Sequence, residues 1–288
     1  MIARLRAATP RTRAALAILA LITLGAALVP ALAPTDPRAI GDVLRLRLLP
    51  PFSIDAAGHF HPLGTDRFGR DIFTRMMLAA RTSLLVGVVG AVLAGAAGIA
   101  VGAVAAWSGG VVDRLAMALS DTLLAIPRLI LLLVCAALWS PSAAMVITVL
   151  VATGWMGVAR LVRAEVLGVR HRPFVEGARA LGAAGPRILW RHVLPNALGP
   201  AVVAITLGVG SAILLESGMS FLGLGIQPPQ PSWGNMIAEG REVIVVAPWV
   251  ALAPGLALVL TVLACTLLGD ALRDVLAGEA AMTLRDRA

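Results

Sequence analysis

The chain has 288 residues, of which 59% are hydrophobic and 14% are charged, and its mean hydropathy is +0.89. Soluble domains carry about 25% charged residues, so this composition excludes an ordinary soluble protein and predicts an all-α polytopic membrane protein. The formal net charge is +8, and a basic membrane protein more often follows the positive-inside rule than binds nucleic acid. An outer-membrane barrel is excluded as well, because the sequence lacks alternating strands of about ten residues.

The first apolar run, from Ala14 to Ala33, follows four arginines and is long enough to span a bilayer. Ala31-Leu32-Ala33 has the small-x-small form of a signal-peptide cleavage site. Pro34 follows directly, however, and its tertiary amide is a poor bond to cleave. We therefore expect residues 1–35 to form a cytoplasmic N-terminus and an uncleaved anchor helix.

Residues 36–82 are polar and rich in proline, aspartate and arginine, which predicts an extracytoplasmic segment. Gly64 and Gly69 mark turns within it. Asp71 to Ala80 has the spacing of a short amphipathic helix, with its apolar residues on one side. This pattern favours an interfacial helix that leads into the next span.

Five further apolar runs build a predicted core domain over residues 83–275, and residues 276–288 follow as a cytoplasmic tail. Glycines recur about every four residues in the first of these runs, which predicts close packing inside a helix bundle. Six spans place both termini on one side, and the distribution of arginines favours the cytoplasm. The five predicted spans are Leu84–Trp107, Leu115–Trp139, Ala143–Val162, Leu198–Leu215 and Val243–Gly269.

The candidate intramembrane polar residues are Asp121, Arg128 and Glu216. Such charges are expensive in lipid and usually face a bundle interior or an aqueous cavity. Asp121 and Arg128 are seven positions apart, so on one continuous helix they would share a face. Alternatively, both lie at the cytoplasmic end of their span and Arg128 extends to the headgroups. The sequence leaves these two interpretations open.

A polar island between two spans runs from His171 to Asn196. Pro173 suits the first position of a helix, where its missing N–H has little effect. Gly182 offers a stop. The pattern therefore predicts a short helix from Phe174 to Leu181, with a turn at Gly185-Pro186.

The residues of this short helix leave two interpretations. Glu176 can pair with Arg172 and Arg179 on one face. Gly177 and Ala178 leave another face almost bare of side chains, which suits docking into a groove of another protein. The alternative is a solvated connecting loop, because charge runs usually form solvated faces.

The island resembles the EAA loop of ABC-importer permeases. The resemblance rests on Glu176-Gly177-Ala178, on Gly182 six positions after Glu176, and on Leu194-Pro195. Gly177 stands where the motif usually has alanine. The sequence His-Val-Leu-Pro-Asn at 192–196 is similar to the form found in the dipeptide, oligopeptide and nickel permease subfamily.

Several further segments resemble the C-type subunit of that subfamily, in the same order and with similar spacing. Together with the island they cover about His61 to Val275. The resemblance implies a type I ABC-importer permease (MetI-like) fold with six transmembrane helices. The matching segments are His61–Asp71, Gly110–Asp113 with Asp121 and Pro127, Ser220–Gly225, Pro231–Gly234 and Leu268–Asp274.

The resemblance also implies partners and a location. These are a second homologous permease, two cytoplasmic ABC ATPase subunits, an extracytoplasmic solute-binding protein and the lipid bilayer of a bacterial cytoplasmic (inner) membrane, with both termini cytoplasmic. The chain itself is expected to be no enzyme and to bind no cofactor, because ATP and Mg belong to the ATPase subunits. A phosphate-binding loop needs a lysine, and the chain contains none.

Two groups of site residues follow from the resemblance. Residues 164–197 are implied to form the coupling loop to the ATPase, with Glu176, Gly177, Ala178, Arg179, Gly182, Leu194 and Pro195 as contact residues. The polar segments outside the membrane supply candidates for a gate, for the pathway or for contact with the binding protein. These candidates are Gly64, Thr65, Asp66, Gly69, Arg70, Asp71, Ser220, Phe221 and Trp233.

The leading interpretation is therefore a permease subunit for dipeptides or oligopeptides. A nickel or metal-chelate permease is the runner-up, although His59 and His61 are expected to be structural, so that no metal site is predicted. An ion-driven secondary transporter is a different class, and it would more often show internal repeats. A membrane-embedded enzyme would need paired acids or a metal motif inside the spans, which the sequence lacks.

Overall fold

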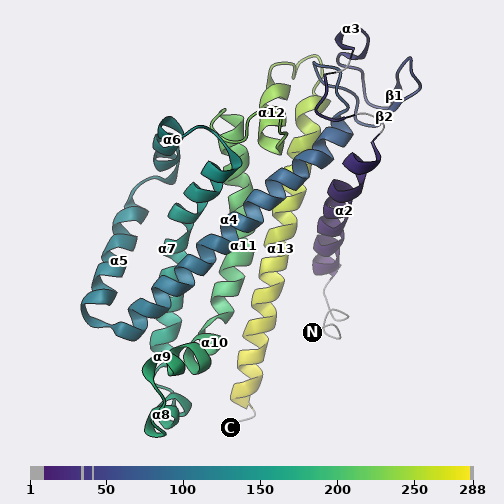
Figure 1. The fold of residues 1–288 in the computed structure, drawn as a ribbon. Coiled ribbons are helices and arrows are strands. Elements are labelled where there is room, and N and C mark those ends of the chain that lie inside the picture. Colours follow the sequence, from purple (N-terminus) through teal and green to yellow (C-terminus); the bar gives the residue numbers. More distant parts are fainter. Residues whose placement is uncertain (1–9, 34–35, 41, 286–288) are drawn as a thin grey trace. The chain divides into compact units, whose positions relative to one another are not determined.

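The computed structural model describes residues 10–33, 36–40 and 42–285, and these are mostly helical (Figure 1). Five helices are long and apolar enough to cross a membrane, namely α2, α4, α7, α11 and, over Trp249–Leu276, α13. Counted as one broken span, the bent pair α5 and α6 is the sixth among the described residues, and the predicted all-α membrane fold is confirmed. The helix bounds are α2 Pro10–Leu32, α3 Val43–Leu46, α4 Ile72–Ser108, α5 Gly110–Ala125, α6 Arg128–Leu138, α7 Ala143–Val169, α8 Pro173–Ala180, α9 Gly185–Ile188, the π-helix η1 Leu189–Val193, α10 Leu194–Ala197, α11 Gly199–Phe221, α12 Trp233–Arg241 and α13 Trp249–Arg285.

The predicted span over Leu115–Trp139 is built of two helices, and their axes meet at 90°. The break falls at Ile126-Pro127, where Ile126 is extended with φ −82° and ψ 124°. Proline has no N–H to donate, and its ring pushes the preceding residue out of the helical region. Asp121 and Arg128 therefore lie on different helices, which excludes the interpretation that they share a face of one continuous helix.

The segment before α4 forms a two-stranded hairpin. Strand β1, Ser53–Ile54, pairs antiparallel with β2, Phe60–His61. The interfacial helix predicted over Asp71–Ala80 is not a separate element, because its residues form the first turns of α4. Between Ile72 and Leu84 there is no glycine or proline, so nothing in the sequence ends the helix there.

The described residues form two compact units. The first comprises the described residues from Pro10 to Val88 together with Cys135–Ile147 and Gly210–Leu267. The second comprises Val89–Val134, Thr148–Val209 and the described residues from Leu268 onward. Helices α4, α6, α7, α11 and α13 contribute residues to both units.

Close helix packing in the second unit depends on the glycines of α4. A Cβ on Gly98 would lie 2.7 Å from the Cβ of Val158 on α7, and a Cβ on Gly102 would lie 3.0 Å from the Cα of Ala159. Such distances leave no room for a side chain, so the backbones of α4 and α7 approach closely. The predicted packing of the glycine-rich span inside a bundle is confirmed.

Candidate functional site

Helix α8 lies where the polar island predicts a helix. Pro173 occupies its first turn, and Arg172 before it is extended, with φ −75° and ψ 147°. The helix ends at Ala180 with Leu181 as its C-cap, one position before the predicted end, and Gly182 follows with φ +77°. That left-handed conformation favours glycine, so the local sequence sets both ends of the helix.

We call residues 164–197 the α8 segment. Within it, one fully buried side chain anchors helix α8 to the neighbouring helices. Val175 is fully buried in an apolar cluster with Val166 and Val169 at the end of α7 and with Ile188 and Val193 beyond α8. Ala178, one turn further along, packs against the same cluster while partly exposed. Helix α8 is therefore seated on α7 and on the chain that returns to α11.

The rest of α8 faces away from this cluster. Glu176, Gly177 and Arg179 are exposed, and the Leu181 side chain is 90% exposed. Within the described part of the chain, the Glu176 carboxylate has no hydrogen-bond or ion-pair partner, so the predicted pairing with Arg172 and Arg179 is wrong. Exposed ion pairs gain little over solvation, which explains why proximity in sequence does not enforce pairing here. The exposed surface of α8 and its C-cap therefore carries the unpaired carboxylate of Glu176 and the apolar side chain of Leu181.

The return from α8 to α11 is a series of short helices. The turn predicted at Gly185-Pro186 is instead the start of α9, where proline fits a first turn. After η1, Leu194 is buried in the same cluster as Val175, whereas Pro195 is exposed. The structure thus brings Leu194 to the base of α8 and leaves Pro195 at the surface.

Two arginines tie the end of α7 to neighbouring helices of the second unit. Arg163 binds Asp113 on α5 through two contacts, Nε–Oδ1 at 2.5 Å and Nη2–Oδ2 at 2.6 Å. Arg170 donates from Nη1 to the carbonyl oxygen of Ala106 on α4 at 2.9 Å. Sequence reasoning missed both ties, although Asp113 lies in a segment that carries the family resemblance.

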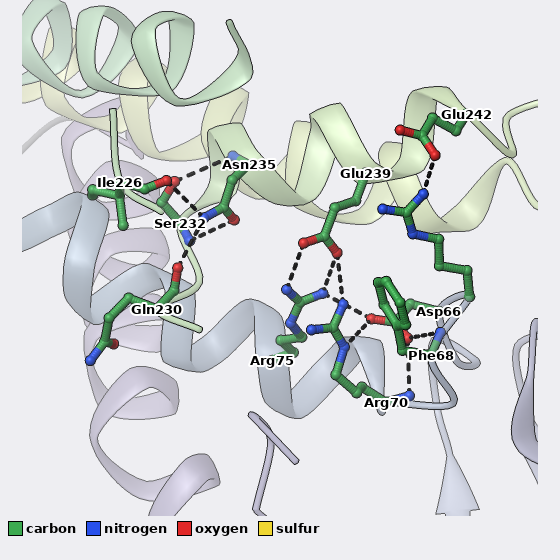
Figure 2. Close-up of polar contacts among 11 residues, drawn as sticks. Asp66, Phe68, Arg70, Arg75, Ile226, Gln230, Ser232, Asn235, Glu239 and Glu242 are labelled. Carbon is green, nitrogen blue, oxygen red and sulfur yellow. Dashed lines mark hydrogen bonds and ion pairs between the residues drawn. The ribbon is translucent and has the colours of Figure 1, made fainter. Parts of the chain in front are cut away.

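A network of four charged side chains links the loop before α4 to α12 in the first unit (Figure 2). Arg75 binds Glu239 through Nη1–Oε2 at 2.7 Å and Nη2–Oε1 at 3.0 Å, and it binds Asp66 at 2.8 Å. Arg70 also binds both acids, Asp66 at 2.7 Å and Glu239 at 2.8 Å. We call Asp66, Arg70, Arg75 and Glu239 the Asp66 network.

Burial raises the pKa of Glu239. Hydrogen bonding to Arg75 and the charges of Arg75, Arg70 and Arg67 outweigh this effect and hold the pKa below its usual value. Asp66 and Arg70 were sequence candidates, whereas Arg75 and Glu239 were not. In the sequence, only the charges of Arg75 and Glu239 could have indicated this network, since a buried charge requires a partner.

A second polar cluster surrounds Glu216, which is fully buried near the end of α11. Its carboxylate accepts hydrogen bonds from Ser83 at 2.9 Å, Ser220 at 2.7 Å and Ser217 at 3.3 Å. The backbone N–H of Trp233 donates to the Ser83 hydroxyl at 3.3 Å. The structure therefore brings together the sequence candidates Glu216, Ser220 and Trp233 through serine hydroxyls.

Phe221 does not join this cluster, because its ring lies beneath the Arg241 guanidinium at 5.3 Å. Trp233, in contrast, is fully buried, and its indole N–H donates to the carbonyl oxygen of Met76 on α4 at 3.2 Å. The capping box of Ser232 and Asn235 begins α12 at this point.

The remaining candidates of the first unit shape the loop before α4. Gly64 has φ +74° and lies so close to the backbone of Leu49 and Pro50 that a side chain would not fit. Gly69 forms another left-handed turn, and Thr65 bonds the backbone of Leu49 at 2.8 Å. These three candidates are structural elements of the loop.

Asp71 and the nearby histidines form a further polar group. Asp71 accepts from the N–H of Thr74 at 2.7 Å at the start of α4, and it contacts His61 Nδ1 at 2.9 Å. His59 Nδ1 contacts Asp55 at 3.1 Å, and backbone hydrogen bonding from His59 lowers the pKa of Asp55 to about 2. Across the described residues, no three histidine, cysteine or acidic side chains are placed to hold a metal ion.

The other two intramembrane candidates lie in the second unit. Asp121 pairs with Arg160 at 3.0 Å, and both side chains are more than half exposed. Arg128 is half-buried and donates from Nε to the Thr153 hydroxyl at 2.7 Å. Asp121 and Arg128 therefore do not contact each other.

Comparison with known proteins identifies the family of the chain. The family described as "Binding-protein-dependent transport system inner membrane component" matches residues 98–279. This chain belongs to that family. It is therefore a transport permease of the inner membrane, and the family works with ATPase and solute-binding partners. The resemblance drawn from the EAA-like island is confirmed.

Two relatives illustrate the similarity of this permease to known members. A "Putative peptide transport system permease protein" of Brucella suis is 40% identical over 264 residues, which cover 92% of this chain and 86% of the relative. The "Dipeptide transport system permease protein DppC" of Alkalihalophilus pseudofirmus is 40% identical over 216 residues, covering 75% of this chain and 71% of the relative. Sequence similarity therefore extends through most of both chains.

A solved structure of the MetNI methionine ABC transporter, in inward-facing conformations, matches the permease with a TM-score of 0.58. The match covers 70% of this chain and 96% of the other, at 20% sequence identity. At this identity the match shows the fold alone. The permease thus has the fold of an ABC-importer permease, as the sequence resemblance implies.

Proposed function

We propose that this permease is the C-type subunit of an ABC importer that carries dipeptides or oligopeptides across the cytoplasmic membrane. The support is the extent of similarity to relatives that are named for peptide and dipeptide transport, at 40% identity over 92% and 75% of the chain. The sequence at 192–196 agrees with the dipeptide, oligopeptide and nickel branch of the family. In this proposal the second permease subunit is a homologue, and the two together form the pathway.

We further propose that α8 is the element through which ATP hydrolysis drives transport. Its exposed face offers Glu176, Gly177 and Arg179 to an ATPase subunit, while Val175 fixes the helix to the end of α7. Gly182 shapes the end of this helix, Leu194 supports it from the returning chain, and Pro195 is exposed beside Leu194. ATP and Mg belong to two ATPase subunits, so this chain binds neither.

The proposed orientation follows from this role. Residues 164–197 face the cytoplasm, and both termini lie on the same side. The loop before α4 and helix α12 then face outward, where a solute-binding protein delivers the solute. Gly64, Thr65, Asp66, Gly69, Arg70, Asp71, Ser220, Phe221 and Trp233 belong to that outward part in this proposal.

Uptake of a radiolabelled dipeptide by the complete complex in proteoliposomes tests both proposals. Glu176→Arg is expected to abolish ATP-dependent uptake while the complex still assembles, because it reverses an unpaired exposed charge on α8. Arg187→Glu is the matched control, since it reverses an exposed charge elsewhere in the same segment. Unchanged uptake by Glu176→Arg would exclude the coupling role. Uptake of nickel instead of peptide would replace the substrate class, and uptake without ATP would exclude the ABC mechanism.

A further inference from the structure

Arg128 occupies an unusual position at the break between α5 and α6. It is the first residue of α6, and Ala125, Ile126 and Pro127 before it are exposed. Its Nε donates to the Thr153 hydroxyl at 2.7 Å, and that hydroxyl donates onward to the carbonyl oxygen of Val149 at 2.8 Å. The Thr153 side chain is buried, so this chain of hydrogen bonds fixes the guanidinium against α7.

The contact with Thr153 places the Arg128 guanidinium far from the ends of α7. Thr153 is the eleventh of the 27 residues of α7. At about 1.5 Å per residue, this is roughly 15 Å from one end of the helix and roughly 24 Å from the other. The apolar layer of a bilayer is about 30 Å thick, so the guanidinium belongs to the interior of the membrane layer.

The charge of Arg128 is not neutralised by any residue that the structure describes. In the part of the chain that the structure describes, no carboxylate lies within ion-pair distance of Arg128. Asp121, the nearest acid in the sequence, is paired with Arg160 instead. Among the described residues, the Nε of Arg128 has a hydrogen-bond partner and its two Nη groups have none, and Nη2 lies beside Gly154. An intramembrane cation without a partner is by default a functional site.

We propose that Arg128 binds a carboxylate group of the transported solute on the translocation path. The planar guanidinium presents parallel donors that match both oxygens of a carboxylate. Gly154 contributes by its lack of a side chain, because a Cβ there would lie 3.2 Å from Nη2 and would crowd the guanidinium. The exposed break gives access to the site. This inference rests on the proposed function, since a peptide carries a carboxylate at its C-terminus.

The test compares a peptide with its C-terminal amide in the reconstituted complex. The binding protein is first shown to hold both compounds, and each is then supplied at a saturating concentration. Uptake is measured for the wild-type permease, Arg128→Gln, Arg128→Lys and Thr153→Val. The preference of the binding protein is the same in all four, so the acid-to-amide ratio isolates the contribution of the permease.

Loss of one charge-assisted contact in a dry site is expected to lower the acid-to-amide uptake ratio roughly tenfold or more in Arg128→Gln. Arg128→Lys should retain part of the preference, because the charge remains without the planar fork. Thr153→Val should lower it by a smaller factor, since the guanidinium keeps its charge but loses its anchor. Thr153→Val also serves as the test if Arg128→Gln fails to assemble.

An unchanged ratio in both Arg128→Gln and Thr153→Val would overturn the inference. Equal loss of both compounds in Arg128→Gln, with an unchanged ratio in Thr153→Val, would also overturn it and would give Arg128 a structural role, such as pairing with an acid of the second permease. The proposed function fails separately, because the wild-type complex would then import neither compound.

Discussion

Arg163 and Asp113 form a two-pronged ion pair that joins α7 to α5, six residues before α7 ends and three residues after α5 begins. Both contacts, at 2.5 Å and 2.6 Å, have the parallel geometry in which guanidinium and carboxylate bind most strongly. The pair lies on the helix that leads directly into the α8 segment. The helix that precedes the α8 segment is therefore linked to α5 by an ion pair.

We predict that Asp113→Asn and Arg163→Gln each reduce uptake without preventing assembly. The Arg163 side chain is 34% exposed, so solvent screening limits the pair to about 1 kcal/mol of stability. A double-mutant cycle in thermal unfolding should give a coupling energy of that size. Additive losses of the two single variants would show that the pair contributes nothing. Asp121→Asn is the matched control, because its pair with Arg160 is more than half exposed.

Glu239→Gln is expected to destabilise the purified permease by about 2 kcal/mol, since it leaves two buried guanidinium groups with half of their counter-charge. Glu242→Gln is the control on the same side of the protein. Glu242 pairs with Arg67, but its side chain is 56% exposed, so its loss should fall within about 0.5 kcal/mol. Thermal unfolding of both variants in detergent measures the difference. Equal effects would mean that the Asp66 network adds no more than a surface pair.

The depressed pKa of Glu239 predicts a pH dependence. A carboxylate whose pKa is lower in the folded state stabilises that state above its unfolded pKa, near 4.5. That contribution is lost as the pH falls below 4.5 and through the folded pKa of Glu239. The melting temperature of the wild type should therefore fall in this window, and Glu239→Gln should show a shallower decrease.

Asp55 provides the comparison for this pH effect. Its pKa falls from 3.8 to about 2, so its contribution is lost in a lower pH range. Asp55→Asn should leave the decrease that starts near pH 4.5 intact. If both variants have the same pH profile as the wild type, neither carboxylate controls acid stability.

Gly102 and Gly157 offer a matched pair for the packing of α4 against α7. A Cβ on Gly102 would meet the backbone of Ala159, whereas a Cβ on Gly157 would meet nothing within 4 Å. Gly102→Ala should therefore destabilise the protein by about 1–3 kcal/mol through overpacking. Gly157→Ala should be neutral or slightly stabilising, because alanine favours helix over glycine. Thermal unfolding measures the stability of the two variants, and equal stability would exclude the close approach of α4 and α7.

Local signals in the sequence were sufficient for α8. Pro173 and Gly182 set the ends of the helix, and the positions between them need no distant partner to become helical. Pro127 carries the same kind of local signal, because proline disfavours a helical conformation in the residue before it. It did not reveal that the chain bends by 90°, since the packing on either side decides the direction.

Long-range polar contacts were beyond the reach of the sequence. Arg75 and Glu239 are separated by 164 positions, and only the folded arrangement of α4 and α12 brings them together. Ser83 is similarly remote from Glu216, at 133 positions, whereas Ser217 and Ser220 are its neighbours in the sequence. The sequence could mark Glu216 as a charge in need of a partner, but it could not choose which hydroxyl groups would serve.

The Asp66 network combines two arginines with two acids, and the neighbouring Arg67 and Glu242 add one charge of each sign. Its formal charge is therefore zero, and each of its four side chains has an ion-pair partner within the network. A solute that approaches these side chains meets no net attraction or repulsion, whether it is a lysine-rich or a glutamate-rich peptide. This part of the permease presents no net formal charge to the solute, which suits a carrier of chemically diverse peptides.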